Sequence, residues 1–246
     1  MKLDIGSTTV LANGVKMPLL GLGVFKSADG DEVQNAIKYA SDAGYRLIDT
    51  ASVYGNEKGV GEAISELSVP REELFVTSKV WNSDQGYDKT LQAFDLSLSK
   101  LKLDYLDMYL IHWPVNGKYL DTWKAMEKLY KEGRVKAIGV SNFLQHQLED
   151  IIDNTSVIPM LNQIEHHPWL TQPDLVSFCE SRKIQVQAWA PLMQGKIFDI
   201  KLFGQLAEKY GKSPAHIVIR WNLQKGIAVI PKSVKQHRIV DNAQVF

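Results

Sequence analysis

Residues 105–113, Tyr-Leu-Asp-Met-Tyr-Leu-Ile-His-Trp, show the pattern on which the whole chain is built. The centre of this stretch, Met108 to Ile111, is continuously apolar, which is typical of a strand buried on both faces. Trp123, Met126 and Tyr130 follow with the spacing of one helical face. A buried strand followed by an amphipathic helix is the unit of a parallel sheet covered by helices.

This unit recurs along the chain, and it predicts eight strands at 18–23, 45–50, 74–80, 105–113, 135–142, 159–166, 184–192 and 227–233. Asn13-Gly14, between Val10-Leu11 and Val15, predicts a tight hairpin turn with positive φ at both central residues. We therefore expect an α/β fold, a (β/α)8 TIM barrel with an N-terminal β-hairpin closing the bottom. An open doubly wound sheet is the alternative that the same alternation allows.

Composition narrows the class of protein. A chain of 246 residues matches one barrel, and no linker or change of composition divides it, so we expect a single domain over 1–246. Lys and Arg number 28 and Asp and Glu number 28, so no basic surface for nucleic acid is expected. No apolar run approaches the roughly 20 residues of a membrane helix, and residues 1–10 lack the features of a signal peptide.

The single cysteine, Cys179, excludes an intrachain disulfide. Without a disulfide framework a reducing compartment is the simpler interpretation, so we expect a cytoplasmic protein, and we expect it to be a monomer.

The candidate site follows from the strand ends, because the active site of such a barrel lies at the C-terminal ends of its strands. Polar side chains and one tryptophan occupy those ends: Asp49, Thr50, Ser78, Lys79, His112, Ser141, Asn142, Asn162, Gln163, Glu165, Trp189, Lys232 and Ser233. Each has a structural alternative. Asp49 and Lys79 suit an ion pair, a lone histidine or tryptophan suits the core, and Ser141-Asn142 suits a helix N-cap. Their joint placement indicates a site.

Other motifs are incomplete. Gly21-Leu22-Gly23 begins like a dinucleotide fingerprint, but Lys26 stands where the third glycine belongs. Glu165-His166-His167 resembles a metal cluster, but neighbouring strand residues point to opposite faces, so no metal site is expected. The chain contains neither a phosphate-binding Walker motif nor a nucleophile elbow.

Four separated motifs resemble the aldo-keto reductase family. They are residues 44–51 with 54–57, residues 106–114, residues 139–143 and residues 230–233. Within the family, residues 79–82 and 190–195 are most similar to the bacterial glyoxal and 2,5-diketo-D-gluconate reductases. The resemblance implies an NADPH-dependent reduction of aldehydes and ketones, such as glyoxals, small aldehydes and keto-sugars, to alcohols.

The resemblance also implies roles for individual residues. The catalytic residues are Asp49, Tyr54, Lys79 and His112, with Tyr54 as general acid and Lys79 lowering the pKa of its phenol. The nicotinamide carboxamide is bound by Ser141, Asn142 and Gln163, and its ring stacks on Trp189. The adenosine 2′-phosphate is bound by Lys232, Ser233 and Arg238, and the adenine by Asp241 and Asn242. The substrate pocket has aromatic walls from Phe25, Trp81 and Trp113.

The sequence departs from the family pattern in two places. The segment 63–70 is shorter than usual, and the chain ends at Phe246, where family members usually continue with a helix and a tail over the pocket. We therefore expect one wall of the pocket to be open.

Two other functions are possible for such a barrel. One alternative function is a cofactor-binding regulatory subunit with little turnover. The other is an aldolase with Lys79 as its Schiff-base lysine.

Overall fold

The computed structural model describes residues 3–246. Residues 1–2, which begin the N-terminal segment that lacks signal-peptide features, lie outside the described residues. The strands of the main sheet are β3 (Gly21–Gly23), β4 (Leu47–Asp49), β5 (Phe75–Val80), β6 (Leu106–Ile111), β7 (Val135–Ser141), β8 (Leu161–Glu165), β9 (Gln185–Trp189) and β10 (Ala228–Val229). They are parallel and lie in the order β10-β9-β8-β7-β6-β5-β4-β3. Bridges from Leu20 to Val229 and from Gly23 to Lys232 join the two edges. The predicted eight-stranded barrel is confirmed.

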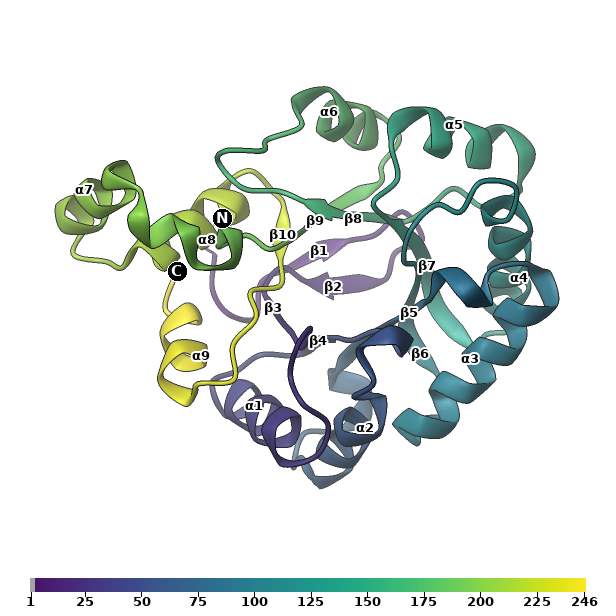
Figure 1. The fold of residues 1–246 in the computed structure, drawn as a ribbon, viewed down its shortest axis with the longest axis horizontal. Coiled ribbons are helices and arrows are strands. Elements are labelled where there is room, and N and C mark those ends of the chain that lie inside the picture. Colours follow the sequence, from purple (N-terminus) through teal and green to yellow (C-terminus); the bar gives the residue numbers. More distant parts are fainter. Residues whose placement is uncertain (1–2) are drawn as a thin grey trace.

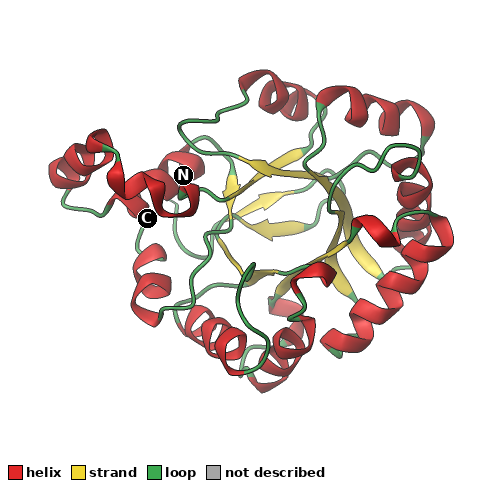
Figure 2. Ribbon diagram, viewed as in Figure 1, coloured by secondary structure: helices red, strands yellow, loops and turns green. Residues whose placement is uncertain are grey.

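Helices surround this barrel (Figures 1 and 2). They are α1 (Asp31–Asp42), α2 (Glu57–Glu66), α3 (Tyr87–Leu101), α4 (Tyr119–Lys131), α5 (Gln145–Asn154), α6 (Pro173–Ser181), α7 (Lys201–Tyr210), α8 (Pro214–Gln224) and α9 (Gln236–Asn242). Short 3₁₀ turns lie at Ser52–Tyr54, Arg71–Glu73, Asn82–Asp84 and Met193–Asp199. None of the helices within residues 3–246 is both long and apolar enough to cross a membrane.

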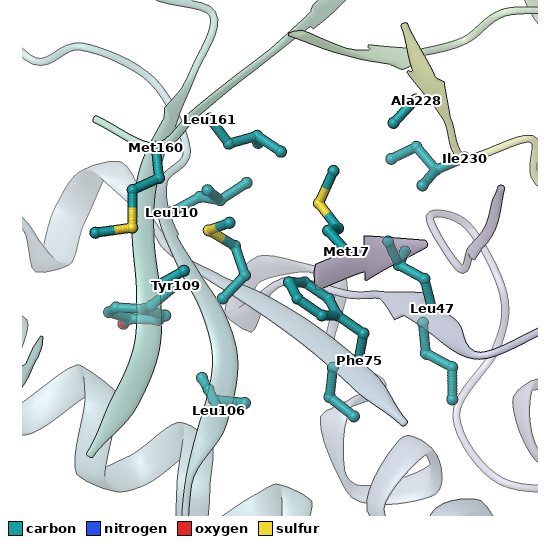
Figure 3. Close-up of a cluster of buried hydrophobic side chains, with 14 of the residues drawn as sticks. Met17, Leu47, Phe75, Leu106, Tyr109, Leu110, Met160, Leu161, Ala228 and Ile230 are labelled. Atoms are coloured by element: carbon teal, nitrogen blue, oxygen red, sulfur yellow. The ribbon is translucent and has the colours of Figure 1, made fainter. Parts of the chain in front are cut away.

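The barrel interior is apolar toward the N-terminal ends of the strands, where the hairpin closes it. The hairpin pairs β1 (Thr8–Val10) with β2 (Lys16–Pro18). Figure 3 shows Met17 of β2 among side chains from β4, β5, β6 and β10, and Met17 is buried. Thr9 Oγ1 donates to Gln185 Oε1 at 2.8 Å, and Asn13 Nδ2 donates to the Lys136 carbonyl at 2.9 Å. These contacts fasten the hairpin to the beginnings of β9 and β7.

The hairpin turn differs from the prediction in one respect. Gly14 has a positive φ of 88°, but Asn13 does not. The Asn13 side chain instead accepts a hydrogen bond from the Val15 amide at 3.2 Å, and Leu11 and Val15 close a longer loop. A local side-chain hydrogen bond thus replaces the second positive-φ residue.

Candidate active site

The residues to which the resemblance gives a role lie together at the C-terminal end of the barrel. All of these except Lys79 line one cavity of about 900 Å³: Phe25, Asp49, Tyr54, Trp81, His112, Trp113, Ser141, Asn142, Gln163, Trp189, Lys232, Ser233, Arg238, Asp241 and Asn242. Four other polar residues predicted at the strand ends do not line it: Thr50, Ser78, Asn162 and Glu165. The end of the barrel that carries the polar strand ends is therefore hollow.

Lys79 lies directly beneath this cavity and is fully buried. Its ammonium is 2.6 Å from Asp49 Oδ1, 2.9 Å from the Thr50 carbonyl and 3.5 Å from Tyr54 Oη. Tyr54 ends the 3₁₀ turn after β4, and Ser52 Oγ donates to the Lys79 carbonyl at 3.0 Å, which fixes this turn against β5. The phenol of Tyr54, the ammonium of Lys79 and the carboxylate of Asp49 therefore lie in series.

The pKa of Tyr54 differs from the expectation. Burial raises the pKa of Tyr54 above 10.0, and the Lys79 ammonium only opposes that rise. The expected net lowering of the pKa is therefore wrong, because desolvation of the phenolate outweighs the neighbouring cation. Burial alone would lower the pKa of Lys79, but Asp49 and Tyr54 together hold it above 10.5. Tyr54 is thus a neutral phenol beside a permanent ammonium.

His112 follows β6 and lines the cavity near Tyr54. Its ring lies 5.7 Å from that of Tyr54 and 5.0 Å from that of Trp81. Burial first, and the Lys79 charge second, lower its pKa to about 3. Its Nδ1 is buried without a hydrogen-bond partner among residues 3–246. The imidazole is therefore neutral at physiological pH.

Aromatic side chains surround Tyr54 and His112. Phe25 lies 5.0 Å from Tyr54, ring to ring, and is 51% exposed, while Trp113 is 42% exposed. The exposure of Trp113 excludes the alternative that this tryptophan is a core residue, and Trp81 and Trp189 are only partly buried. Together with Trp81 they form an apolar wall at one end of the cavity.

Ser141, Asn142 and Trp189 form a hydrogen-bonded group across β7 and β9. The Trp189 indole donates to Asn142 Oδ1 at 2.8 Å, and Asn142 Nδ2 donates to the His112 carbonyl and to Ser141 Oγ, each at 3.0 Å. Asn142 has a φ of 63°, a conformation that asparagine tolerates. The alternative of a plain helix N-cap is wrong, because α5 begins after Leu144.

Gln163 has an unexpected partner. Its Nε2 donates to Asp49 Oδ2 at 2.8 Å and to Gln187 Oε1 at 2.7 Å. Gln187 lies within β9 and is buried, and it belongs to none of the motifs in the sequence. A polar residue at an otherwise apolar strand position was the available signal.

The far end of the cavity carries the predicted cations. Lys232 Nζ donates to the Lys26 carbonyl at 3.3 Å, and Arg238 is exposed without an ion pair among the described residues. Asp241 lies 3.4 Å from His216 Nε2, and Asn242 is buried beside them in α9. Sequence reasoning missed the segment after β9, from which Gln194, Gly195 and Phe198 also line the cavity.

The Glu165-His166-His167 segment behaves as an ordinary strand end. His166 Nδ1 lies 2.7 Å from Asn222 Oδ1, whereas His167 Nε2 lies 3.4 Å from Glu165. Within residues 3–246, no three His, Cys, Asp or Glu side chains gather as metal ligands would.

Known proteins resemble this chain in sequence and in fold over nearly its whole length. The profile of the aldo/keto reductase family matches residues 19–246. Glyoxal reductase of Bacillus subtilis (strain 168) is 54% identical over 246 residues, which are all of this chain and 89% of that protein. Methylglyoxal reductase DkgA of Salmonella typhimurium (strain LT2) is 52% identical over 240 residues, 96% of this chain and 86% of that protein. The crystal structure of a Bombyx mori aldo-keto reductase in complex with NADP superposes with a TM-score of 0.92 at 36% identity, covering 100% of this chain and 89% of that one.

Proposed function

Because the chain belongs to the aldo/keto reductase family, we propose that it reduces small aldehydes and ketones to alcohols with NADPH, and that Tyr54 is the proton donor. One observation carries the proposal. A single cavity joins the Tyr54–His112 end to the Lys232–Arg238 end, so one bound dinucleotide would have room to reach both. Glyoxals, small aldehydes and keto-sugars are the proposed substrates, and the similarity to glyoxal reductase supports the first of these.

The side chains along the cavity fit a nicotinamide dinucleotide phosphate. Gln163 uses its Nε2 inside the protein, so its Oε1 is left to accept from the carboxamide. Lys232 and Arg238 supply two cations for the 2′-phosphate, and a guanidinium binds phosphate through two hydrogen bonds. Trp189 lines the cavity between these ends and offers a surface for stacking. When bound, the nicotinamide would supply the hydride.

The protein supplies the proton and the orientation. Tyr54 stays protonated because burial raises its pKa, and it donates as negative charge develops on the carbonyl oxygen. The Lys79 ammonium, 3.5 Å away, stabilises the phenolate that this transfer leaves, and Asp49 holds Lys79 in place. His112 is neutral, and with Nδ1 buried we assign its proton to Nε2, which would donate to the carbonyl oxygen. The aromatic wall would shield the carbonyl group from water on its own side of the cavity.

The geometry disfavours the aldolase alternative. A Schiff-base lysine must be unprotonated and must reach its substrate. Lys79 is fully buried, is held by Asp49 and the Thr50 carbonyl, and has a raised pKa. Turnover measurements separate the proposed reductase from a cofactor-binding regulatory subunit.

The variant Tyr54→Phe tests the proposal because it removes only the phenolic hydroxyl. We expect the rate of aldehyde reduction to fall by at least the roughly 10²- to 10⁴-fold typical of lost general acid catalysis. NADPH binding, followed by quenching of tryptophan fluorescence, should change little. Tyr210→Phe, at an exposed position in α7, is the matched control and should reduce aldehydes like the wild type. Near-normal turnover by Tyr54→Phe would show that another group supplies the proton.

A further inference from the structure

We infer that Gln187 is a positioning residue, which orients the Gln163 amide toward the cofactor and, through Asp49, aligns Lys79 with Tyr54. The inference rests on the proposed function, because it assigns the cavity-facing atom of Gln163 to nicotinamide. Gln187 does not line the cavity, so it acts through its neighbour and not by contact with substrate or cofactor.

A continuous chain of hydrogen bonds carries this inference across the barrel. Gln187 Oε1 on β9 accepts from Gln163 Nε2 on β8 at 2.7 Å, and the same nitrogen donates to Asp49 Oδ2 on β4 at 2.8 Å. The other oxygen of Asp49 accepts from Lys79 on β5 at 2.6 Å, and Lys79 donates to Tyr54 at 3.5 Å. Gln187, Gln163, Asp49 and Lys79 are all at most 2% exposed. Water therefore does not compete for these hydrogen bonds.

The donors and acceptors in this chain select one orientation of the Gln163 amide. A primary amide has two N–H donors on its nitrogen and acceptor sites on its oxygen. Both neighbours of Nε2, Asp49 Oδ2 and Gln187 Oε1, are acceptors, so each takes one N–H. The flipped amide would set its oxygen against these two acceptors. Gln163 Oε1 is therefore turned to the cavity, where an acceptor complements the NH₂ group of a carboxamide.

The same contacts connect cofactor binding to the proton donor. Asp49 is held on one oxygen by Gln163 and on the other by Lys79. If Gln163 loses its second acceptor, its amide can rotate, and Asp49 loses a fixed partner. Because Asp49 sets the position of the Lys79 ammonium, the phenol of Tyr54 then has a less fixed electrostatic environment.

A pair of variants tests this role. Gln187→Leu keeps a side chain of similar size but removes the acceptor. Gln187→Glu replaces the amide oxygen with a carboxylate oxygen, which can still accept from Gln163 Nε2. For Gln187→Leu we expect NADPH to bind about tenfold more weakly, the effect of losing one hydrogen bond in a buried site. The pH dependence of kcat should also shift relative to the wild type. Gln187→Glu keeps an acceptor for the Gln163 amide but adds a buried charge, so it should bind NADPH more tightly than Gln187→Leu and not necessarily as tightly as the wild type. If Gln187→Leu does not fold, Gln187→Met gives the same comparison.

A fragment without nicotinamide provides the internal control. Adenosine 2′,5′-bisphosphate reaches only the Lys232–Arg238 end, so its affinity, measured by calorimetry, should be the same for the wild type and Gln187→Leu. Equal weakening of NADPH and the fragment would overturn the inference, and so would unchanged NADPH binding and pH dependence in Gln187→Leu. A Gln187→Glu variant as impaired as Gln187→Leu would overturn it too. Failure of the wild type to bind NADPH would overturn the proposed function itself, which distinguishes the two failures.

Discussion

At the scale of single residues, His112 makes the stability of the protein depend on pH. Burial and the Lys79 charge lower its pKa from 6.5 to about 3. Between these values the unfolded chain binds a proton at this residue and the folded chain does not. The stabilising contribution of neutral His112 is therefore complete above pH 6.5 and is lost progressively as the pH falls toward 3.

This linkage predicts that the wild type is more sensitive to mild acid than His112→Gln. Between pH 7 and pH 5 the wild type should lose about 2 kcal/mol more of its free energy of unfolding than the variant, since 1.36 kcal/mol corresponds to one pH unit of linked protonation. Urea denaturation of both proteins at the two pH values measures the difference. Parallel losses would show that His112 is not the group responsible.

Much of the site could be predicted from residue types at strand ends, because parallel strands bring their C-terminal ends to one mouth of the barrel. Two features could not. The pKa direction of Tyr54 depends on the depth of burial, which outweighs the cation next to it. The role of Gln187 depends on the register of β8 and β9, which places it beside Gln163.

At the scale of elements, the eight strands were predictable, but their ends and one loop were not. β10 has only two residues, and beyond it the chain joins β3 through the isolated Gly23–Lys232 bridge and a hydrogen bond from the Gly23 amide to the Pro231 carbonyl at 3.3 Å. After β9, Ala190, Met193 and Gln194 all have positive φ. Such residues give no turn signal in a sequence, so this cavity-lining segment follows from its tertiary surroundings and not from local preference.

The seam between β3 and the last strand predicts the effect of a single methyl group. A Cβ on Gly23 would lie 2.8 Å from the Ile230 carbonyl oxygen, which belongs to the backbone and cannot move aside alone. Gly23→Ala should therefore reduce the free energy of unfolding by about 1–3 kcal/mol, the typical cost of overpacking. Gly204→Ala in α7, where the added Cβ meets nothing within 4 Å, is the control and should cause no loss. Thermal and urea unfolding compare the three proteins, and equal stability of Gly23→Ala and the wild type would contradict the prediction.

At the scale of the whole molecule, residues 3–246 form two hydrophobic clusters of very different size. The main cluster fills the barrel and the interface with its helices. The second contains only Ile197, Phe203, Ala215 and Val218 as buried members, and it joins α7 and the 193–199 segment to α8. Figure 1 shows α7 outside the ring of helices. Opening of α7 therefore exposes far less apolar surface than opening of the barrel.

This difference predicts two rates of amide hydrogen exchange. Amides in α7 should exchange by local opening, at least about tenfold faster than those in β5, β6 and β7, which exchange only when the barrel itself opens. NADPH should slow exchange within 193–199, because Gln194, Gly195 and Phe198 line the cavity that we assign to the cofactor. Mass spectrometry of peptides covering 193–210 and the central strands measures both effects. Equal exchange of α7 and the barrel strands would show that the molecule opens as one unit, and the small second cluster would then not limit the stability of α7.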